Sequence, residues 1–518
     1  MMTSSSRSPE PIIPAMRTNP TPFMRATLLP WLLTATLLSS CATVTNPVTG
    51  LAERTVMDEK SEIAEGEKGH QQVLKEYGVY NDPKVQAYVN ELGQRLARQS
   101  HRNTIEWHFT VLDSPEINAF ALPGGYVYVT RGIMAYMESE ADLAGVIGHE
   151  IGHVTARHGA QRATRQQTAG FGVLAASLLG AVLESQGVGG AGQLASQVSQ
   201  NVAAGYIASY GRDQELQADQ LGAEYLARSH YDPQNMVNVI TVLKNQERFA
   251  DDQAKAEGRQ PGARSNWLSS HPSNDQRLAD ITRIAATYPS SQHSDDGRTR
   301  YLNTVKGMTF GEGREQGLTR GRNFYHEPLG IAVTAPEGWK IQNSPQSIAL
   351  LNGAGDAGLV IKTIPANAGN THEEIIRKVI QPTQGSVEAR TVSGLPATHF
   401  VGTRRNQQGQ TQRIEATVVS GPADRHYLLG YASKDAAALQ RAAAQLREAE
   451  ASFRAMTPAD RQAARPWVLK LAPYPKGGFQ QLAKPSPWGP QAEQQLRLIN
   501  GVYAGGEPKA GQLVKVIE

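Results

Sequence analysis

Apolar residues recur at helical spacing between Ser139 and Arg165. They would share one side of a helix: Leu143, Val146, Ile147, Ile151 and Val154. Such a stripe indicates a helix that is buried along that side. Ser139 is a favourable N-cap residue, and Asp142 three positions later completes a capping-box pattern. The pattern therefore predicts one helix over residues 139–165.

Segments on either side of this helix carry shorter patterns. Residues 106–112 alternate between apolar and polar positions and predict a strand, and residues 118–130 predict a second, longer strand with a Gly-Gly pair between its halves. Residues 232–249 and 274–288 have the character of helices. The first half of the chain is therefore expected to form a mainly helical domain with a small sheet.

The pattern changes at Phe324. Short apolar runs separated by turn residues predict strands at 329–334, 347–351, 358–364, 397–403, 413–420 and 425–431. Two longer segments, 371–380 and 433–456, predict helices. This half has no cluster of His, Cys or paired carboxylates at catalytic spacing, so we expect an α+β accessory domain with a binding or positioning role. The fold class of the whole chain is α+β.

These changes predict six regions along the chain. They are an N-terminal extension with a signal peptide (1–41), a tether (42–60), a first domain (61–288), a linker (289–323), the accessory domain (324–460) and a C-terminal tail (461–518). Residues 169–208, rich in small side chains, are expected to form a helical hairpin near the active-site cleft or else to pack in the core. The tail is expected to end in a β-structure or to resemble the second half of a LysM-like glycan-binding module.

The N-terminal region resembles a bacterial lipoprotein signal. An apolar run at 26–38 follows Arg25 and ends in Leu-Ser-Ser before Cys41, which would become the lipidated residue after cleavage. Met24 is an alternative start. Cys41 is the only cysteine of the 518 residues, so no disulfide can form within the chain. The predicted location is the periplasm, with Ala42 after the cysteine favouring the outer membrane.

The chemistry is concentrated in His149-Glu150-Ile151-Gly152-His153. Residues four apart project from nearly the same face of a helix, so the two histidines can offer imidazole nitrogens to one metal ion. Glu150 would lie beside the ion, placed to take a proton from a water molecule. An HExxH string indicates a zinc-dependent hydrolase. Burying two histidines and a glutamate on one helix costs free energy, and metal binding would explain why they are there.

The third ligand is expected on a later helix. An HExxHxxGxxH motif is excluded, because Ala156 and Gly159 stand where its glycine and third histidine would be, and His158 comes one residue too early. Glu215 and Asp219 share one helical face. Glu215 can close a two-His, one-Glu site, while Asp219 can accept the second N–H of a ligating histidine.

These motifs resemble the zinc metallopeptidases of the HtpX, BepA and CAAX prenyl protease type, in the gluzincin group. The resemblance covers about residues 62–285. It rests on the HExxH helix, on Glu215-x-x-Ala218-Asp219, and on the segments 77–83 and 118–125. It implies one Zn²⁺ per chain, in a soluble periplasmic lipoprotein branch of the family.

The resemblance also implies roles for individual residues. His149, His153 and Glu215 would bind zinc, Glu150 would be the catalytic general base, and Asp219 would support a ligand. His271, in a His-Pro element, would be a regulatory ligand or would assist the transition state. An edge strand beside the zinc helix would bind substrate backbone by strand addition. The expected strand residues are Tyr126, Val127, Tyr128 and Val129.

The implied function is that of a metalloprotease in protein quality control. It would be a hydrolase that cleaves misfolded or stalled envelope proteins. The alternative is a chaperone or assembly factor for outer-membrane proteins, with a latent zinc site capped by His271. Peptidoglycan or the outer-membrane assembly machinery are further expected partners. The charge balance of 51 basic and 48 acidic residues, with no basic stripe or phosphate loop, argues against a nucleic-acid partner.

Overall fold

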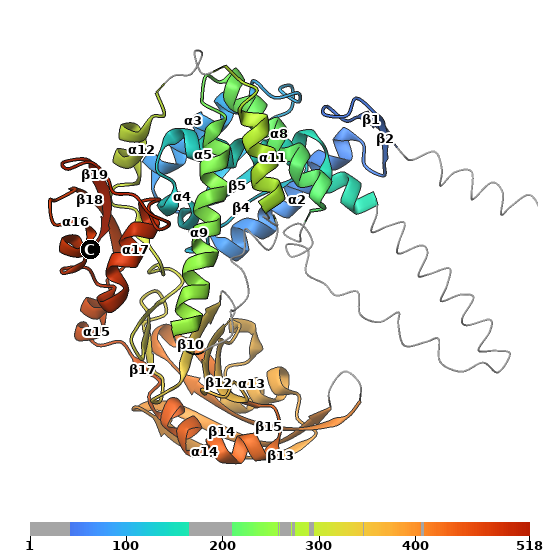
Figure 1. The fold of residues 1–518 in the computed structure, drawn as a ribbon. Helices are drawn as coiled ribbons and strands as arrows, with labels where there is room; N and C mark the ends of the chain where they lie inside the picture. Colours follow the sequence, from blue (N-terminus) through green and yellow to red (C-terminus); the bar gives the residue numbers. More distant parts are fainter. Residues whose placement is uncertain are drawn as a thin grey trace, which may run out of the picture.

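The computed structural model describes residues 42–164, 210–256, 258, 271, 275–289, 295–344, 347–405 and 409–518. Figure 1 shows an upper, mainly helical body and a lower body built on a large sheet. The predicted signal peptide with Cys41 and the predicted helical hairpin at 169–208 lie outside the described residues. No helix in the described ranges combines the length and the apolar character needed to cross a bilayer.

The upper body surrounds one buried helix, α5, Glu140–Thr155. Every residue of α5 is buried, and the Ser139 side chain accepts a hydrogen bond from Asp142 N, as the capping pattern predicted. The surrounding helices are α2 (Glu59–Tyr77), α3 (Pro83–Ala97), α4 (Arg131–Tyr136), α8 (Arg212–Arg228), α9 (Gln234–Ala256) and α11 (Asp275–Ala285).

The helix predicted over 139–165 is interrupted. Helix α5 ends at Thr155, Arg157 adopts a left-handed conformation with φ of 55°, and a second helical segment begins at His158. An ion pair from Arg157 to the buried Glu62 and a second pair to the exposed Glu59 hold this turn. Hydrophobic periodicity continues through the turn and therefore could not reveal it.

The predicted long strand at 118–130 is a hairpin. Strands β4 (Ala119–Leu122) and β5 (Tyr126–Thr130) pair antiparallel across a turn in which Gly124 and Gly125 both have positive φ. Strand β3 (His108–Leu112) pairs parallel with the other side of β5. The sheet order is therefore β3-β5-β4, with β5 in the centre.

The predicted linker contains part of the upper core. Helix α12 (Arg298–Val305) buries Tyr301, and strand β6 (Thr309–Phe310) pairs with β18 (Trp467–Pro473), far along the sequence. Strand β18 also pairs with β19 (Leu513–Ile517), which gives a three-stranded sheet ordered β19-β18-β6. The only sign of this packing in the sequence is the scattered apolar residues of a polar segment.

The predicted tail is likewise part of the upper body. Strand β18, helices α16 (Gly478–Ala483) and α17 (Ala492–Ile499), and strand β19 share their buried residues with the core around α5. Lys515 on β19 is fully buried, and its Nζ donates to Ala135 O at 3.0 Å and Met137 O at 2.7 Å and pairs with Glu138.

The lower body confirms the predicted α+β character. Its seven-stranded antiparallel sheet has the order β10-β11-β12-β16-β15-β14-β13. The strands are β10 (Lys340–Ser344), β11 (Ser347–Leu351), β12 (Ala357–Thr363), β13 (Gln384–Val392), β14 (Leu395–Arg405), β15 (Thr411–Ser420) and β16 (His426–Ser433). Helix α14 (Ala436–Ala451) packs on the sheet through Ala442, Leu446 and Ala449, and α13 (His372–Ile375) lies over the other end.

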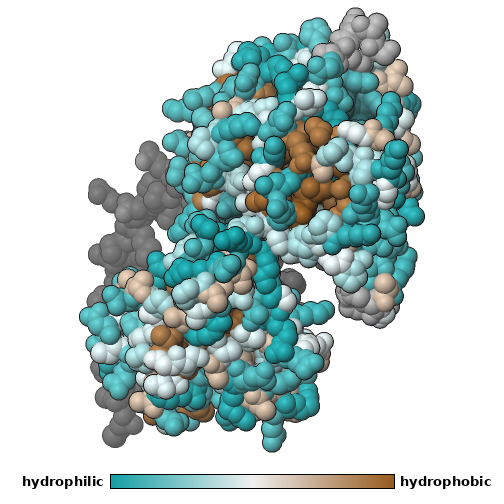
Figure 2. Space-filling model, turned by 90° about the vertical axis from the view of Figure 1, so that its left-hand side faces the viewer, coloured by the Kyte–Doolittle hydropathy of each residue, from teal (hydrophilic) through white to brown (hydrophobic). Residues whose placement is uncertain are grey.

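A second, smaller sheet connects the lower body to the upper one. Its order is β17-β9-β8-β7, and its strands are β7 (Leu318–Arg320), β8 (Asn323–His326), β9 (Ile331–Thr334) and β17 (Arg454–Ala455). The chain leaves the upper body after β6 and returns to it at β18. We infer that the accessory domain is an insertion between these two strands. Figure 2 shows the two bodies as separate masses and a group of hydrophobic side chains on the upper one.

The predicted tether is folded. Strands β1 (Ala42–Thr45) and β2 (Ala52–Thr55) form an antiparallel hairpin, and its turn residue Asn46 is 2% exposed. Val56 N donates to Thr164 Oγ1 at 3.0 Å, in the helical segment that follows Arg157. The hairpin is therefore attached to the upper body beside the HExxH helix.

Candidate metal centre

The two histidines of the HExxH sequence meet as predicted. His149 and His153 project one turn apart from α5, both are at most 2% exposed, and their Nε2 atoms are 3.0 Å apart. Helix α8 crosses α5 closely because glycine faces it there. A Cβ added at Gly152 would lie 2.9 Å from Ala218 O. This close crossing brings the first turn of α8 over the histidines.

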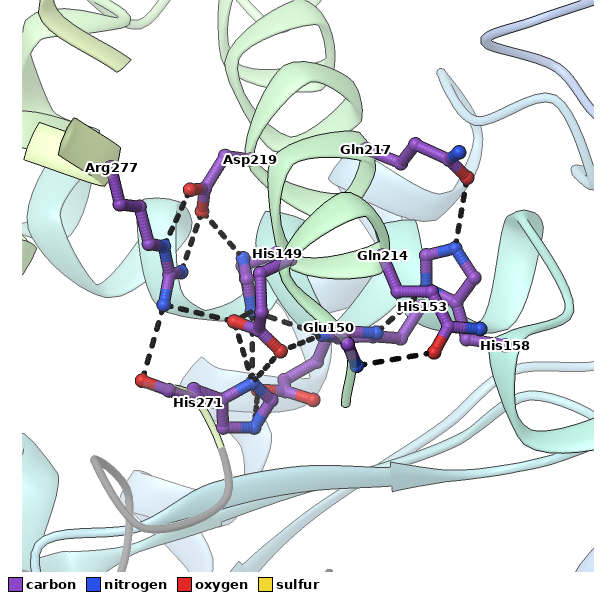
Figure 3. Close-up of polar contacts among 11 residues, drawn as sticks. His149, Glu150, His153, His158, Gln214, Gln217, Asp219, His271 and Arg277 are labelled. Carbon is purple, nitrogen blue, oxygen red and sulfur yellow. Dashed lines mark hydrogen bonds and ion pairs between the residues drawn. The ribbon is translucent and has the colours of Figure 1, made fainter. Parts of the chain in front are cut away.

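Glu215 and Asp219 reach the histidines from α8, as Figure 3 shows for Asp219. Glu215 Oε1 lies 3.5 Å from His153 Nε2, and Glu215 Oε2 lies 3.6 Å from His149 Nε2. Asp219 Oδ1 lies 2.8 Å from His149 Nδ1, on the opposite side of the ring. Glu215 therefore lies beside the two Nε2 atoms, and Asp219 lies at the other nitrogen of His149, as predicted.

His271 joins the same cluster. It is 1% exposed, and its Nδ1 lies 3.0 Å from Glu215 Oε1 and 3.2 Å from His149 Nε2. His149, His153, Glu215 and His271 can each direct one ligand atom within 4.8 Å of the others. Within the described ranges, this is the one group of His, Cys, Asp or Glu side chains that could hold a metal ion.

The spacing of the donors fits zinc. Tetrahedral Zn²⁺ with nitrogen and oxygen ligands at about 2.0–2.2 Å places its ligand atoms about 3.3 Å from one another. The five distances between donor atoms given above lie between 3.0 and 3.6 Å. The set contains three imidazoles and one carboxylate and no sulfur, which suits zinc.

The charges of the cluster balance through Arg277 on α11. Its guanidinium donates to both oxygens of Asp219, pairs with Glu215 Oε2 at 2.8 Å and donates to His271 O. Burial would raise the pKa of Asp219, but the Arg277 charge holds it below its usual value. The pKa of Glu215 is lowered against burial by His271 and Arg277. Both carboxylates are therefore ionised, as ligation and support of a ligand require.

The histidine pKa values move in opposite directions. Burial, with His149 next to it, lowers the pKa of His153 well below the usual value, so its imidazole is neutral and able to bind a metal. Burial alone would lower the pKa of His271 as well, but the carboxylates of Glu215 and Glu150 raise it. The pKa of His271 therefore lies above that of His153.

Glu150 lies next to the ligand set, close to His271. Its side chain is fully buried, and its Oε1 is 3.5 Å from His271 Nε2. The carboxylate is adjacent to the donor cluster without belonging to it, which is the position that general-base chemistry requires. Figure 3 shows Glu150 and His271 on the same side of the His149 ring.

Two further side chains contact His153. The Tyr210 ring stacks on the His153 ring, with centroids 3.9 Å apart and an angle of 19° between the planes. His158 Nδ1 lies 2.9 Å from His153 Nδ1. No motif or spacing in the sequence points to Tyr210. The spacing of His158 in the sequence excludes it as a metal ligand. The turn at Arg157 nevertheless brings it into contact with His153, which the sequence pattern does not predict.

The strand predicted to bind substrate lies in the interior of the sheet and not at its edge. Residues Tyr126 to Val129 form β5, which is paired with β3 on one side and with β4 on the other. A strand with both sides paired cannot accept another strand. The edge nearest the histidines is β4, since Ala121, Leu122 and Pro123 line one small pocket together with His153 and Tyr210. The sequence pattern predicts a single long strand here, and it does not indicate which strand of the hairpin lies at the edge.

Residues 83–285, which contain all these groups, match the model of peptidase family M48. Over these residues the chain is similar to the M48 peptidases. The cluster of three histidines and Glu215 lies within these residues and fits a zinc ion, with His271 and Glu215 in different parts of the matched region.

Relatives of the M48 domain occur in bacteria and in mitochondria. The beta-barrel assembly-enhancing protease of Escherichia coli is 34% identical over 207 residues, which are 40% of each chain. The protein of that name from Yersinia pestis is 30% identical over 243 residues, 46% of this chain and 47% of its own. The mitochondrial metalloendopeptidase OMA1 of Arabidopsis thaliana is 30% identical over 203 residues, 39% of this chain and 36% of its own.

The likeness to these relatives is confined to part of each protein. The chain spans less than half of the length of each of these three relatives. Among solved structures, the PsbP protein of Synechocystis aligns with 27% of this chain and 98% of its own, at 14% identity and a TM-score of 0.19.

Proposed function

We propose that this protein is a zinc-dependent endopeptidase that hydrolyses peptide bonds of misfolded or stalled envelope proteins. The position of Glu150 carries the proposal. A buried carboxylate lies next to a complete set of zinc donors and outside it. His149, His153 and Glu215 are the proposed ligands, and Asp219 fixes the tautomer of His149 by accepting its Nδ1–H.

The proposed roles follow from this arrangement. Zinc, when bound, supplies a Lewis acid that polarises a carbonyl and promotes ionisation of water. Glu150 accepts a proton from the attacking water at a carboxylate oxygen and returns it to the departing amine nitrogen. Because Arg277 keeps Asp219 and Glu215 ionised, Glu150 is the carboxylate in this cluster that is left to move a proton.

Strand β4 is the proposed substrate-binding edge. Thr130 N donates to Asn118 O, so the Asn118–Thr130 pair is directly bonded. Bonded and non-bonded pairs alternate in an antiparallel ladder, and Ala121 opposite Val127 is therefore a non-bonded position. Its N–H and C=O point away from β5. An extended peptide can pair with them beside His153.

Replacing Ala121 with proline tests this edge. Ala121→Pro removes the outward N–H without breaking a bond to β5, a position where strands tolerate proline. One lost main-chain hydrogen bond is worth about 1.4 kcal/mol, so kcat/KM for a peptide substrate should fall about tenfold. Ala121→Gly keeps the N–H and should stay within about threefold of wild type. Equal activities of the two variants would place the substrate on another strand.

The main alternative is a latent state of the same site, in which His271 blocks the metal. Catalytic zinc sites keep one position open, whereas structural sites fill all four. In the structure His271 supplies the fourth donor. With His271 in place the centre is closed, which is the geometry expected of a chaperone or assembly factor that is not cutting. The two functions are compatible if His271 can withdraw.

Zinc content and casein cleavage of wild type and His271→Ala distinguish these roles. We expect one zinc per chain in both proteins, because three proposed ligands remain, and several-fold faster cleavage by the variant. A fall in activity with zinc retained would assign His271 to catalysis. Absence of zinc from the wild type would refute the proposed function.

The proposed setting is the periplasmic face of the outer membrane, with Cys41 as the lipid anchor. The signal-like sequence before Cys41 and the names of the bacterial relatives support this setting. The substrates proposed on the same grounds are outer-membrane proteins that fail to assemble, and the assembly machinery is the proposed partner. Quality control in the envelope is the corresponding role.

A pocket on the C-terminal region favours a second function, glycan binding. Strand β18, helices α16 and α17 and strand β19 follow one another as the LysM-like prediction requires. The loops after β18 and before β19 border an open pocket of about 620 Å³. Polar and aromatic side chains line it, among them Tyr474, Glu493, Arg497 and Glu507. This mixture suits a sugar ring and its hydroxyl groups, and peptidoglycan is the proposed ligand.

Sedimentation with purified peptidoglycan tests the second function. We expect Arg497→Ala to reduce the sedimented fraction, because Arg497 pairs with Glu493 and Glu507 in the pocket. Truncation at Pro466 is unsuitable, because β18 and β19 complete the upper core. Arg461→Ala, an exposed arginine outside the pocket, is the matched control. Equal sedimentation of both variants and wild type would exclude the pocket as a glycan site.

A further inference from the structure

A chain of hydrogen bonds joins the N-terminal hairpin to the metal centre. Asn46, in the hairpin turn, donates through Nδ2 to Gln217 Oε1 at 3.0 Å and to Glu53 Oε1 at 2.9 Å. Its Oδ1 accepts from the backbone of Val48 and Thr49. The amide of Asn46 is therefore fully used, with its oxygen holding the turn and its nitrogen reaching α8.

The chain continues through His158. Its Nε2 lies 3.1 Å from Gln217 Oε1, and its Nδ1 lies 2.9 Å from His153 Nδ1. His158 and His153 are both almost completely buried. Figure 3 shows Gln217, His158 and His153 in sequence, leading from α8 to the donor cluster.

The geometry allows one arrangement of protons along this chain. His153 directs Nε2 at the other donors, so its Nδ1 carries the proton and donates to His158 Nδ1. His158 must then carry its own proton on Nε2 and donate it to Gln217 Oε1. That oxygen also accepts from Asn46, which fixes the orientation of the Gln217 amide.

The two zinc-helix histidines are thus oriented by different acceptors. His149 donates to Asp219, a carboxylate neutralised by Arg277, whereas His153 donates to a neutral imidazole. A charged acceptor holds its partner without further help. A neutral imidazole accepts at Nδ1 when its proton is on Nε2, and the Gln217 oxygen, oriented by Asn46, favours that tautomer by accepting this proton in a hydrogen bond.

A second set of contacts ties the hairpin to the segment that carries His158. Gln161 donates to Glu53 and to Ala156 O, and Val56 N donates to Thr164 Oγ1. Gln214 Nε2 donates to Gln161 Oε1 at 2.7 Å, so the same segment is also attached to the first turn of α8. The hairpin therefore contacts both elements that place His158.

We propose that Asn46, Gln217 and His158 are positioning residues of the zinc site, and that the hairpin of residues 42–55 is an integral part of that site. The inference rests on the proposed zinc-dependent function and deepens it. The hairpin orients His153 through Gln217 and His158. Loss of any of the three contacts lets the His153 ring rotate and weakens zinc binding, although none of these residues touches the metal.

Zinc affinity of the purified protein, measured by competition with a chromophoric chelator, tests the proposal. Loss of a partner that orients a ligating histidine typically weakens metal binding about 10–100-fold. We expect that range for Gln217→Met, which keeps the length of the side chain but has no acceptor oxygen. Gln217→Glu keeps an oxygen that accepts from both neighbours and should bind zinc within about threefold of wild type.

Asn46→Ala tests the hairpin itself. We expect zinc binding to weaken about tenfold, because Gln217 loses the donor that fixes its amide. Asn103→Ala, at an exposed position on the same body, is the matched control and should match wild type. Thermal unfolding of the zinc-free proteins reveals any variant that has lost the fold, and the Gln217 pair tests the proposal independently of the hairpin turn.

The outcomes separate this inference from the proposed function. If wild type binds zinc and cleaves casein while Asn46→Ala and Gln217→Met bind zinc equally well, the positioning chain is refuted and the peptidase stands. If wild type itself binds no zinc, the proposed function fails first. Weaker zinc binding by Gln217→Met with recovery in Gln217→Glu, together with weaker binding by Asn46→Ala, would support the inference.

Discussion

Glu150→Gln is expected to abolish casein cleavage while one zinc ion per chain remains bound. Glu150 lies outside the set of donors, so an amide in its place leaves His149, His153 and Glu215 unchanged. The amide cannot accept a proton from water. General-base catalysis contributes about 10²–10⁴ to a rate, and kcat should fall by at least about a hundredfold. Zinc content by elemental analysis and cleavage of casein measure the two effects on the same sample.

Glu224→Gln is the matched control for this substitution. Glu224 is a partly exposed glutamate on α8 that pairs with Arg228, away from the donor cluster. The same change of charge there should leave both zinc content and cleavage at wild-type values. Retention of full activity by Glu150→Gln would show that another group takes the proton, and loss of zinc would place Glu150 among the ligands.

Arg277→Met is expected to destabilise the zinc-free protein by about 3–5 kcal/mol. The substitution leaves the buried carboxylates of Asp219 and Glu215 without their guanidinium, and an uncompensated buried charge costs about that much. Bound zinc supplies positive charge next to Glu215. The loss should therefore be smaller with zinc than without it. Urea unfolding of the protein with and without zinc, followed in the upper body, measures the two free energies of unfolding.

Arg283→Met provides the control on the same helix. The Arg283 side chain is 75% exposed, and a surface substitution of this kind changes stability by less than about 0.5 kcal/mol. Arg277→Lys keeps the charge but cannot make the two-pronged contact with Asp219, so we expect an intermediate loss. Equal destabilisation by Arg277→Met with and without zinc would mean that Arg277 is not part of the charge balance of the site.

The central helix and its histidines could be predicted because local patterns determine them. An apolar stripe, an N-cap and two histidines at a four-residue spacing all require a helix at the same place. Glu215 and Asp219 could be predicted as a pair for the same reason. These two carboxylates reach the histidines because α8 crosses α5 closely at Gly152. The metal-binding motif implies that the two helices meet, but the local sequence pattern does not predict it.

The remaining features depend on contacts between distant segments. Arg157 has no local preference for a left-handed conformation, and its ion pairs with the first turn of α2 stabilise the turn that places His158. The burial of α12 and the pairing of β6 with β18 likewise depend on partners far along the chain. Polar composition made these segments look like a linker and a tail.

Strand β19 is the last element of the described chain, and it belongs to the core that surrounds the zinc helix. Its fully buried Lys515 ties it to the segment just before α5. During synthesis, that core therefore stays unfinished until the whole inserted domain has been made, so that the packing around α5 is completed only after the accessory domain has had time to fold.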